Sequence, residues 1–153
     1  MLQIGDPAPD FELLSDENQP IRLSDLRGRR VVLFFFPRAD TPGCTAQACG
    51  FRDRMPVIET GNATVLGLSP DLPSALAKWR AKEKLPYNLL SDPDHEVADA
   101  FGAWGEKSMY GKTYEGIIRS TILIDRQGRI AQVWRNVRVD GHADAVLQAA
   151  RAL

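Results

Sequence analysis

The sequence is poor in cysteine, in long hydrophobic runs and in excess charge of either sign. Lys and Arg number 19 against 20 Asp and Glu, so no overall positive field is available to attract a nucleic-acid backbone. The longest strongly apolar run, residues 31–36, is too short to cross a bilayer. We therefore expect neither a nucleic-acid-binding protein nor a membrane protein.

The N-terminus lacks a basic start followed by an apolar stretch, the pattern of a secretory signal, so a cytoplasmic location is expected. A reducing compartment disfavours a permanent structural disulfide. The chain has only two cysteines, Cys44 and Cys49, and they lie close together in the sequence. We therefore expect them to serve redox or catalytic chemistry.

The 153 residues are ordinary in composition, and they suit one domain spanning residues 1–153. Strand patterns cover residues 11–14, 21–23, 30–36, 64–69, 88–90, 117–124 and 129–134, and helical patterns cover residues 42–54, 72–84, 95–101 and 143–152. The run 30–36 lacks alternation, which is typical of a strand buried on both faces. Residues 104–116 are expected to form a loop. This order predicts an α/β protein with a thioredoxin-like fold, a mixed central sheet flanked by helices.

Cys44 follows Thr41-Pro42-Gly43 at the start of the predicted helix. Exposed N–H groups and the helix dipole favour an anion there, and the thiolate is the reactive form of cysteine. Lowering a thiol pKa from ~8.5 to ~6 requires about 3.4 kcal/mol, whereas a helix terminus supplies at most ~2 kcal/mol. Further donors are therefore needed. Arg119, an arginine within a largely apolar strand, is the best candidate, although an edge-strand arginine reaching solvent is the alternative.

Cys49 lies five residues beyond Cys44 in the same predicted helix. That spacing separates the two Cα atoms by roughly 8–9 Å in an intact helix, whereas a disulfide rarely exceeds ~6.8 Å. If the two sulfurs bond, the first turns must unwind, and Gly50 would ease that change. The alternative is a pair of buried apolar thiols that never meet.

Several motifs together carry a family resemblance. The segment PRADTPGCT at 37–45 resembles the peroxiredoxin active-site loop, and ACGFRD at 48–53 is similar to the Q-type branch, also called bacterioferritin comigratory protein. Further matches are GDPAPDF at 5–11, LSDP at 90–93, WGEK at 104–107, YGK at 110–112 and RST at 119–121. The resemblance covers nearly the whole chain. It implies a thioredoxin fold with an N-terminal strand extension.

The resemblance also implies an activity, a thiol-dependent peroxidase acting on hydrogen peroxide and organic hydroperoxides without a cofactor or metal. Cys44 would be the peroxidatic and Cys49 the resolving cysteine of an intramolecular disulfide. Thr41 would hydrogen-bond the thiolate or peroxide, and Arg119 would orient and polarise the peroxide. Pro37 and Gly43 are the expected substrate-binding residues, Pro37 as a shield of the pocket. Thioredoxin, or sometimes glutaredoxin, would be the reductant, and a monomer is expected.

This chain departs from the family pattern at Gln47, where many Q-type members carry a glutamate. Any ion pair that such a glutamate would make is therefore in question. Thiolate formation alone would not explain fast turnover, because nucleophilicity falls as the thiol pKa falls. The charge that develops as the O–O bond breaks must also be stabilised.

Three alternatives remain open at this point. A Cys₂His₂ zinc site is disfavoured because His95 and His142 lie far apart in the sequence, and His142 is expected at the surface. A thiol–disulfide oxidoreductase would ordinarily carry a Cys-x-x-Cys motif, which this chain lacks. A redox sensor that signals through Cys44 remains compatible with the sequence.

Overall fold

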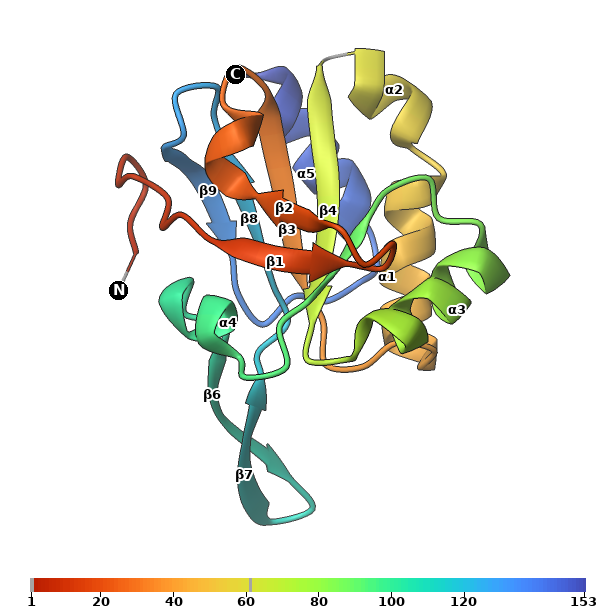
Figure 1. The fold of residues 1–153 in the computed structure, drawn as a ribbon. Helices are drawn as coiled ribbons and strands as arrows, with labels where there is room; N and C mark the ends of the chain where they lie inside the picture. The colour runs from red at the N-terminus through yellow and green to blue at the C-terminus, as the bar shows by residue number, and fades with distance from the viewer. Residues whose placement is uncertain (1, 61) are drawn as a thin grey trace.

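A seven-stranded mixed sheet forms the centre of the computed structural model, which describes residues 2–60 and 62–153 (Figure 1). Its strands are β1 (Glu12–Ser15), β2 (Pro20–Arg22), β3 (Arg30–Phe35), β4 (Ala63–Ser69), β5 (Leu89–Ser91), β8 (Ser120–Ile124) and β9 (Ile130–Trp134). The spatial order is β2-β1-β5-β4-β3-β8-β9. The β3, β4 and β5 strands run parallel, whereas β8 pairs with β3 in the antiparallel sense. This arrangement confirms the predicted mixed sheet.

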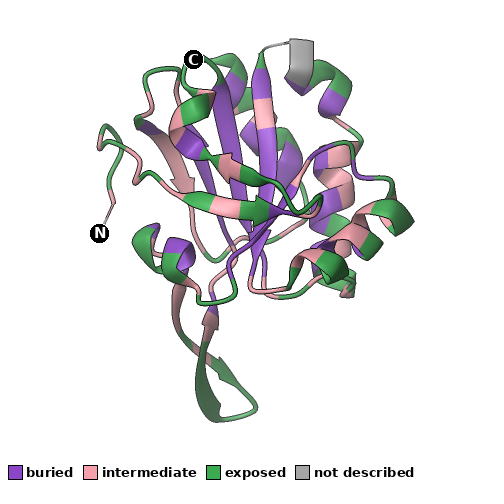
Figure 2. Cartoon of the chain, viewed as in Figure 1, coloured by how far each residue is buried: buried purple, intermediate pink, exposed green. Residues whose placement is uncertain are grey.

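Helices cover both faces of the sheet (Figures 1 and 2). They are η1 (Leu23–Leu26), α1 (Pro42–Arg52), α2 (Met55–Thr60), α3 (Pro73–Glu83), α4 (Glu96–Ala100) and α5 (His142–Arg151). On one face, Val32 and Phe34 of β3 pack with residues of α1, α2, α3 and α5. On the other face, Leu33 and Phe35 pack with residues of η1 and α4. Both faces of β3 are thus buried, which explains its unbroken apolar sequence.

The first long helix is shorter than its sequence pattern predicts. It ends at Arg52, and α2 begins at Met55 with Pro56 in its first turn. Proline is tolerated there because the first-turn N–H has no partner within the helix. The first helix thus ends before Pro56, as expected of a residue that would kink or end it, and Asp53 and Arg54 lie between the two helices.

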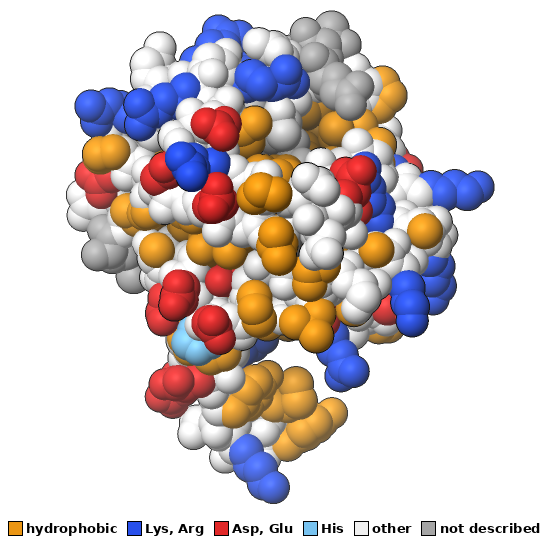
Figure 3. All heavy atoms as spheres, in the orientation of Figure 1, with side chains coloured by type: hydrophobic (Ala, Val, Ile, Leu, Met, Phe, Trp, Pro, Cys, Tyr) orange, Lys and Arg blue, Asp and Glu red, His pale blue; other side chains and the backbone are white. Residues whose placement is uncertain are grey.

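Residues 104–116, expected as a loop, form a β-hairpin instead. Its strands are β6 (Trp104–Met109) and β7 (Lys112–Ile117), joined at Tyr110 and Gly111, both with positive φ (52° and 77°). The hairpin projects from the body of the molecule (Figure 1), and hydrophobic side chains gather on it (Figure 3). Most of its residues are exposed, because both faces of the hairpin lie in solvent. The alternation of hydrophobic and polar residues that is typical of a half-buried strand is therefore absent.

The hairpin is anchored at its base. The ring of His95 stacks on Trp104 with centroids 3.7 Å apart and planes 5° from parallel. Because β7 ends at Ile117, the predicted strand 117–124 is divided into two, and Ile118 and Arg119 form the link before β8. This break positions Arg119 beside the start of α1.

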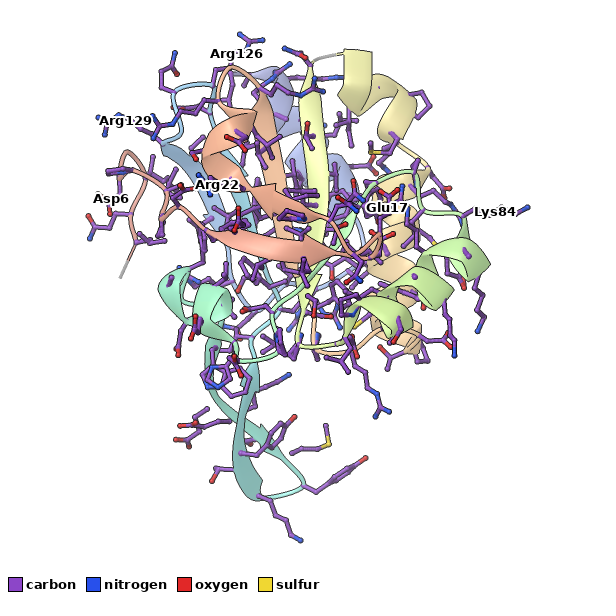
Figure 4. The ribbon with its side chains drawn as sticks, viewed as in Figure 1. Asp6, Glu17, Arg22, Lys84, Arg126 and Arg129 are labelled. Atoms are coloured by element: carbon purple, nitrogen blue, oxygen red, sulfur yellow. The ribbon has the colours of Figure 1, made fainter. Side chains whose placement is uncertain are left out.

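The remaining predicted turn is present. Residues 125–128 connect β8 to β9, and Gly128 has the expected positive φ of 81°. The N-terminal segment lies against the same edge, where Pro7 forms a bridge with Arg129 and Gly5 donates a hydrogen bond to the Ile130 carbonyl. The labelled Asp6 and Arg129 mark this edge (Figure 4). No helix in the described part of the chain is long and apolar enough to span a membrane.

Candidate active site

The start of α1 places Cys44 in a buried position. Thr41 precedes the helix with an extended backbone, and Pro42 occupies the first helical position. The Thr45 N–H donates the first hydrogen bond along the helix, to the Thr41 carbonyl at 2.8 Å. The N–H groups of Gly43 and Cys44 precede that bond and lie at the positive end of the helix dipole. Only 1% of Cys44 is exposed.

Arg119 contacts the sulfur of Cys44 directly. Its Nη2 lies 3.2 Å from the Cys44 Sγ, within the distance of a hydrogen bond to sulfur. Its Nη1 donates to the Gln47 Oε1 at 2.6 Å. The structure thus brings together two residues that are 75 positions apart in the sequence and that were predicted to share a site. A guanidinium can donate to both atoms at once because its N–H groups are fixed in one plane.

Gln47 retains the contact that a glutamate would make but not the charge. The residue is buried, and its Oε1 accepts a hydrogen bond from Arg119, whereas its Nε2 has no hydrogen-bond partner among the residues that the structure describes. An uncharged amide does not neutralise the guanidinium. The positive charge of Arg119 therefore acts on the Cys44 sulfur without a carboxylate at position 47 to oppose it.

A second cation near this site comes from the projecting hairpin. Lys107 of β6 lines a cavity of about 420 Å³ together with Ile118 and Arg119. Burial lowers the pKa of Lys107, and the positive charge of Arg119 lowers it further, while Cys44 acts in the opposite direction. Sequence reasoning assigned no role to Lys107. The WGEK match at 104–107 was the available signal, but the segment was expected to be a loop.

The other predicted site residues lie between the end of β3 and the first turn of α1. Pro37 is half-buried between β3 and α1. A Cβ on Gly43 would lie 3.4 Å from the Arg119 Nη2, so this glycine borders the guanidinium. The Thr41 hydroxyl donates to the Arg38 carbonyl at 2.9 Å. An oxygen that donates in this way still carries lone pairs that accept a hydrogen bond from a hydroperoxide.

Cys49 occupies a different environment on the same helix. Its side chain is half-buried, and its Sγ lies 3.6 Å from the Glu83 Oε2 of α3. Both cysteines are free thiols. Burial raises the pKa of the Cys49 thiol, and the negative charge of Glu83 raises it further, whereas Arg52 opposes them.

His142 is buried, which corrects the expectation of a surface residue. Its ring packs edge-on against Phe51 and Trp134, and its Nε2 shares a 2.7 Å hydrogen bond with the Thr121 Oγ1. Burial, and secondarily the charge of Arg119, lower the pKa of His142 to about 4. The expectation was wrong because a single histidine at the start of a helix, here the first residue of α5, carries no signal of burial in the sequence. Across residues 2–60 and 62–153, no group of three or more His, Cys, Asp or Glu side chains could hold a metal ion.

Comparison with known proteins identifies the family. Residues 4–133 match the model of the AhpC/TSA family, and the chain belongs to that family. It is 47% identical over 146 residues to peroxiredoxin Bcp of Escherichia coli, an alignment covering 95% of this chain and 94% of the relative. These similarities confirm the predicted peroxiredoxin relationship.

Solved structures agree with that assignment. The bacterioferritin comigratory protein of Xanthomonas campestris, studied for its alkyl peroxide reduction activity, matches with a TM-score of 0.91 and 36% identity, covering 99% of this chain and 97% of that one. Peroxidoxin BcpB of Mycobacterium tuberculosis matches with a TM-score of 0.88 and 37% identity, covering 100% and 99%. The thioredoxin-like peroxiredoxin fold is therefore confirmed.

Proposed function

We propose that this chain is a thiol peroxidase that reduces hydrogen peroxide and organic hydroperoxides through Cys44. The observation that carries the proposal is the 3.2 Å contact between the Arg119 Nη2 and the Cys44 Sγ at the start of α1. The AhpC/TSA family and the peroxiredoxin relatives support the same activity. The whole chain would act as one domain, and no cofactor or metal is required by the chemistry.

In the first step the Cys44 thiolate attacks one oxygen of the peroxide. The O–O bond breaks, the sulfur is oxidised to a sulfenic acid, and the other oxygen leaves as water or an alcohol after taking up a proton. The guanidinium of Arg119 stabilises the negative charge that develops on the leaving oxygen. The Thr41 hydroxyl oxygen accepts a hydrogen bond from the hydroperoxide, whose hydrogen stays on the oxygen that becomes part of the sulfenic acid, and the leaving oxygen takes its proton from solvent. Pro37 and Gly43 border the space that the substrate enters.

In the second step Cys49 resolves the sulfenic acid. The S–O bond of Cys44 breaks, an S–S bond forms, and the hydroxide leaves as water with the proton of the Cys49 thiol. Because the two residues are too far apart in an intact helix, α1 must unwind locally. A dithiol protein of the thioredoxin or glutaredoxin type then reduces the disulfide. Because both sulfurs belong to one chain, the cycle needs no second subunit, and we propose a monomer. We place the cycle in the cytoplasm, where thiols are kept reduced.

The experiment that tests the proposal follows one turnover by intact mass. One equivalent of hydrogen peroxide should remove two hydrogen atoms from the protein by forming the disulfide. Cys44→Ser should lose turnover completely, whereas Cys49→Ser should consume one equivalent and stop as an oxidised thiol. Normal peroxide turnover by Cys44→Ser would refute the assignment. Faster reduction of insulin disulfides than of peroxide would favour a thiol–disulfide oxidoreductase.

A further inference from the structure

One face of α1 is held by a row of polar contacts from α3 and the segment after it. The α1 residues involved are spaced at i, i+3, i+4 and i+7, so they share one side of the helix. The contacts are Trp79 Nε1 to Thr45 Oγ1 at 3.1 Å, Tyr87 hydroxyl to the Ala48 carbonyl at 2.7 Å, Cys49 Sγ to Glu83 Oε2 at 3.6 Å, and Arg52 Nη1 to the Glu83 carbonyl at 2.8 Å. We call this row the α1–α3 latch.

The latch includes a sulfur that the proposed cycle must move. Cys49 cannot reach Cys44 while α1 is intact. Glu83 is the residue of the latch that touches the Cys49 sulfur, and it holds α1 twice, through its side chain and through its carbonyl. Figure 4 shows the labelled Lys84, the next residue along the chain, directed away from the molecule. Glu83 is thus the last residue of α3 that contacts α1.

Two roles for the Glu83 carboxylate make opposite predictions. As a base it would take the proton of Cys49 and speed the attack on the sulfenic acid. As an acceptor it would hold the neutral thiol in place and slow that attack. Ordinary carboxyl and thiol groups differ by about four pKa units, so a carboxylate holds the thiol proton only about once in 10⁴ encounters. That magnitude favours the holding role.

We propose that Glu83 is a positioning residue for the resolving step: its carboxylate holds the Cys49 thiol against α3, and release of that contact limits closure of the disulfide. This inference rests on the proposed function for the sulfenic acid that Cys49 meets. It adds a residue and a direction of effect, because removing Glu83 should speed the resolving step. The sulfenic acid would persist for a shorter time in such a variant.

The charges around Cys49 are consistent with this role. Glu83 faces the sulfur from α3, Arg52 and Asp53 face it from the end of α1, and the buried Tyr87 lies on the same side. Glu83 and Asp53 oppose formation of the thiolate, whereas Arg52 favours it. Changing Glu83 to an uncharged residue therefore makes the Cys49 thiolate easier to form.

A first experiment tests the contact without any peroxide chemistry. In a Cys44→Ser background, alkylation of Cys49 by iodoacetamide is measured as a function of pH, with and without Glu83→Gln. The midpoint should move to lower pH, and the rate at pH 7 should rise. Glu115→Gln, the same chemical change on the exposed strand β7, is the matched control and should change neither. An unchanged midpoint in Glu83→Gln would overturn the proposal.

A second experiment measures the resolving step in the full-length protein with both cysteines. After one equivalent of hydrogen peroxide, stopped-flow measurement follows the tryptophan fluorescence, to which Trp79, hydrogen-bonded to Thr45 of α1, contributes. Acid-quenched mass spectrometry measures the amount of disulfide formed. Disulfide closure should be faster in Glu83→Gln and faster still, about three- to tenfold, in Glu83→Ala, as expected for loss of one hydrogen bond. Formation of the sulfenic acid should not change.

The outcomes of this experiment separate the two proposals. Slower closure in Glu83→Gln would mean that Glu83 acts as a base, and unchanged closure would mean that its contact does not limit the step; either result overturns the inference. If the unsubstituted protein forms no disulfide at all, the proposed function fails, while the alkylation experiment still decides whether Glu83 holds the Cys49 thiol.

Discussion

The two cysteines lie on one short helix but in opposite electrostatic surroundings. Cys44 is buried at the positive end of α1, 3.2 Å from a guanidinium nitrogen. Cys49 is half-buried, 3.6 Å from a carboxylate oxygen. A cation beside one sulfur favours an anion there, whereas a carboxylate beside the other keeps it a neutral thiol. The contrast agrees with the proposed roles, in which the first sulfur attacks the peroxide and the second resolves the sulfenic acid.

The largest effect is expected from removing the cation on the Cys44 side. Arg119→Ala removes the guanidinium contact with the Cys44 sulfur. It also removes the N–H donors that, in the proposed mechanism, stabilise the oxygen that leaves when the peroxide bond breaks. Loss of such a preorganised donor typically costs ~10²–10³-fold in rate. We expect the second-order rate constant for hydrogen peroxide, measured by stopped flow, to fall by that factor. A decrease smaller than threefold would contradict the claim that Arg119 sets the reactivity of Cys44 apart from that of Cys49.

The next effect concerns His142, whose pKa is lowered by burial and secondarily by the positive charge of Arg119. The His142 pKa is lowered from 6.5 to about 4 in the folded state, so between these pH values the unfolded chain binds a proton that the folded chain does not. The free energy of unfolding should therefore fall as pH drops from about 6.5 to about 4, by about 3 kcal/mol in total. Urea titrations across this range measure the slope.

Two substitutions, His142→Gln and Arg119→Ala, complete that test. His142→Gln removes the titrating group and should flatten the dependence on pH in that window. Arg119→Ala removes a positive charge that disfavours the protonated ring, so the pKa of His142, followed by NMR, should rise in that variant. Equal slopes in the unsubstituted protein and His142→Gln would contradict the assignment of the slope to this residue.

A smaller effect is expected at Gln47, whose uncharged amide contacts Arg119. Gln47→Glu would place a carboxylate against the guanidinium of Arg119. The negative charge would partly neutralise the positive charge that now acts on the Cys44 sulfur. We expect the rate with hydrogen peroxide to fall about tenfold, equal to ~1.4 kcal/mol. The same change removes an amide nitrogen that lacks a partner, so the free energy of unfolding should rise by ~1 kcal/mol or more. Denaturant titration and stopped flow on one preparation test both directions.

The smallest effect is steric. In Gly43→Ala the new methyl group would lie 3.4 Å from the Arg119 Nη2, in ordinary contact, so the fold should persist. The methyl group narrows the space beside the guanidinium. We expect kcat/KM to fall a few-fold more for a bulky hydroperoxide such as cumene hydroperoxide than for hydrogen peroxide. An equal effect on both substrates would mean that Gly43 does not border the substrate.

Sequence reasoning found the sheet and most helices because their patterns reflect burial. The apolar run of β3 is a direct consequence of two covered faces. The hairpin β6–β7 was missed because its strands face solvent and show no such pattern. Arg119 was found because a cation in an apolar strand is unusual, and Cys44 because proline and glycine mark a helix start. Family resemblance supplied the remaining roles.

The contacts of Cys49 could not be found in the same way. Glu83 is the one acidic residue among the charged residues of α3, but nothing in the sequence indicates that its side chain meets Cys49. Only the packing of α3 against α1 shows which charged residue meets the sulfur. The burial of His142 is similar, because it depends on Phe51 and Trp134, which are distant in the sequence.

The most direct test compares the two sulfurs one at a time with the smallest substrate. Cys49→Ser and Cys44→Ser are each mixed with hydrogen peroxide at neutral pH, and the second-order rate constant of the remaining thiol is measured by stopped flow. The account predicts that Cys44 reacts several orders of magnitude faster than Cys49, whose rate should not exceed that of free cysteine. Rate constants of similar size for the two sulfurs would contradict it.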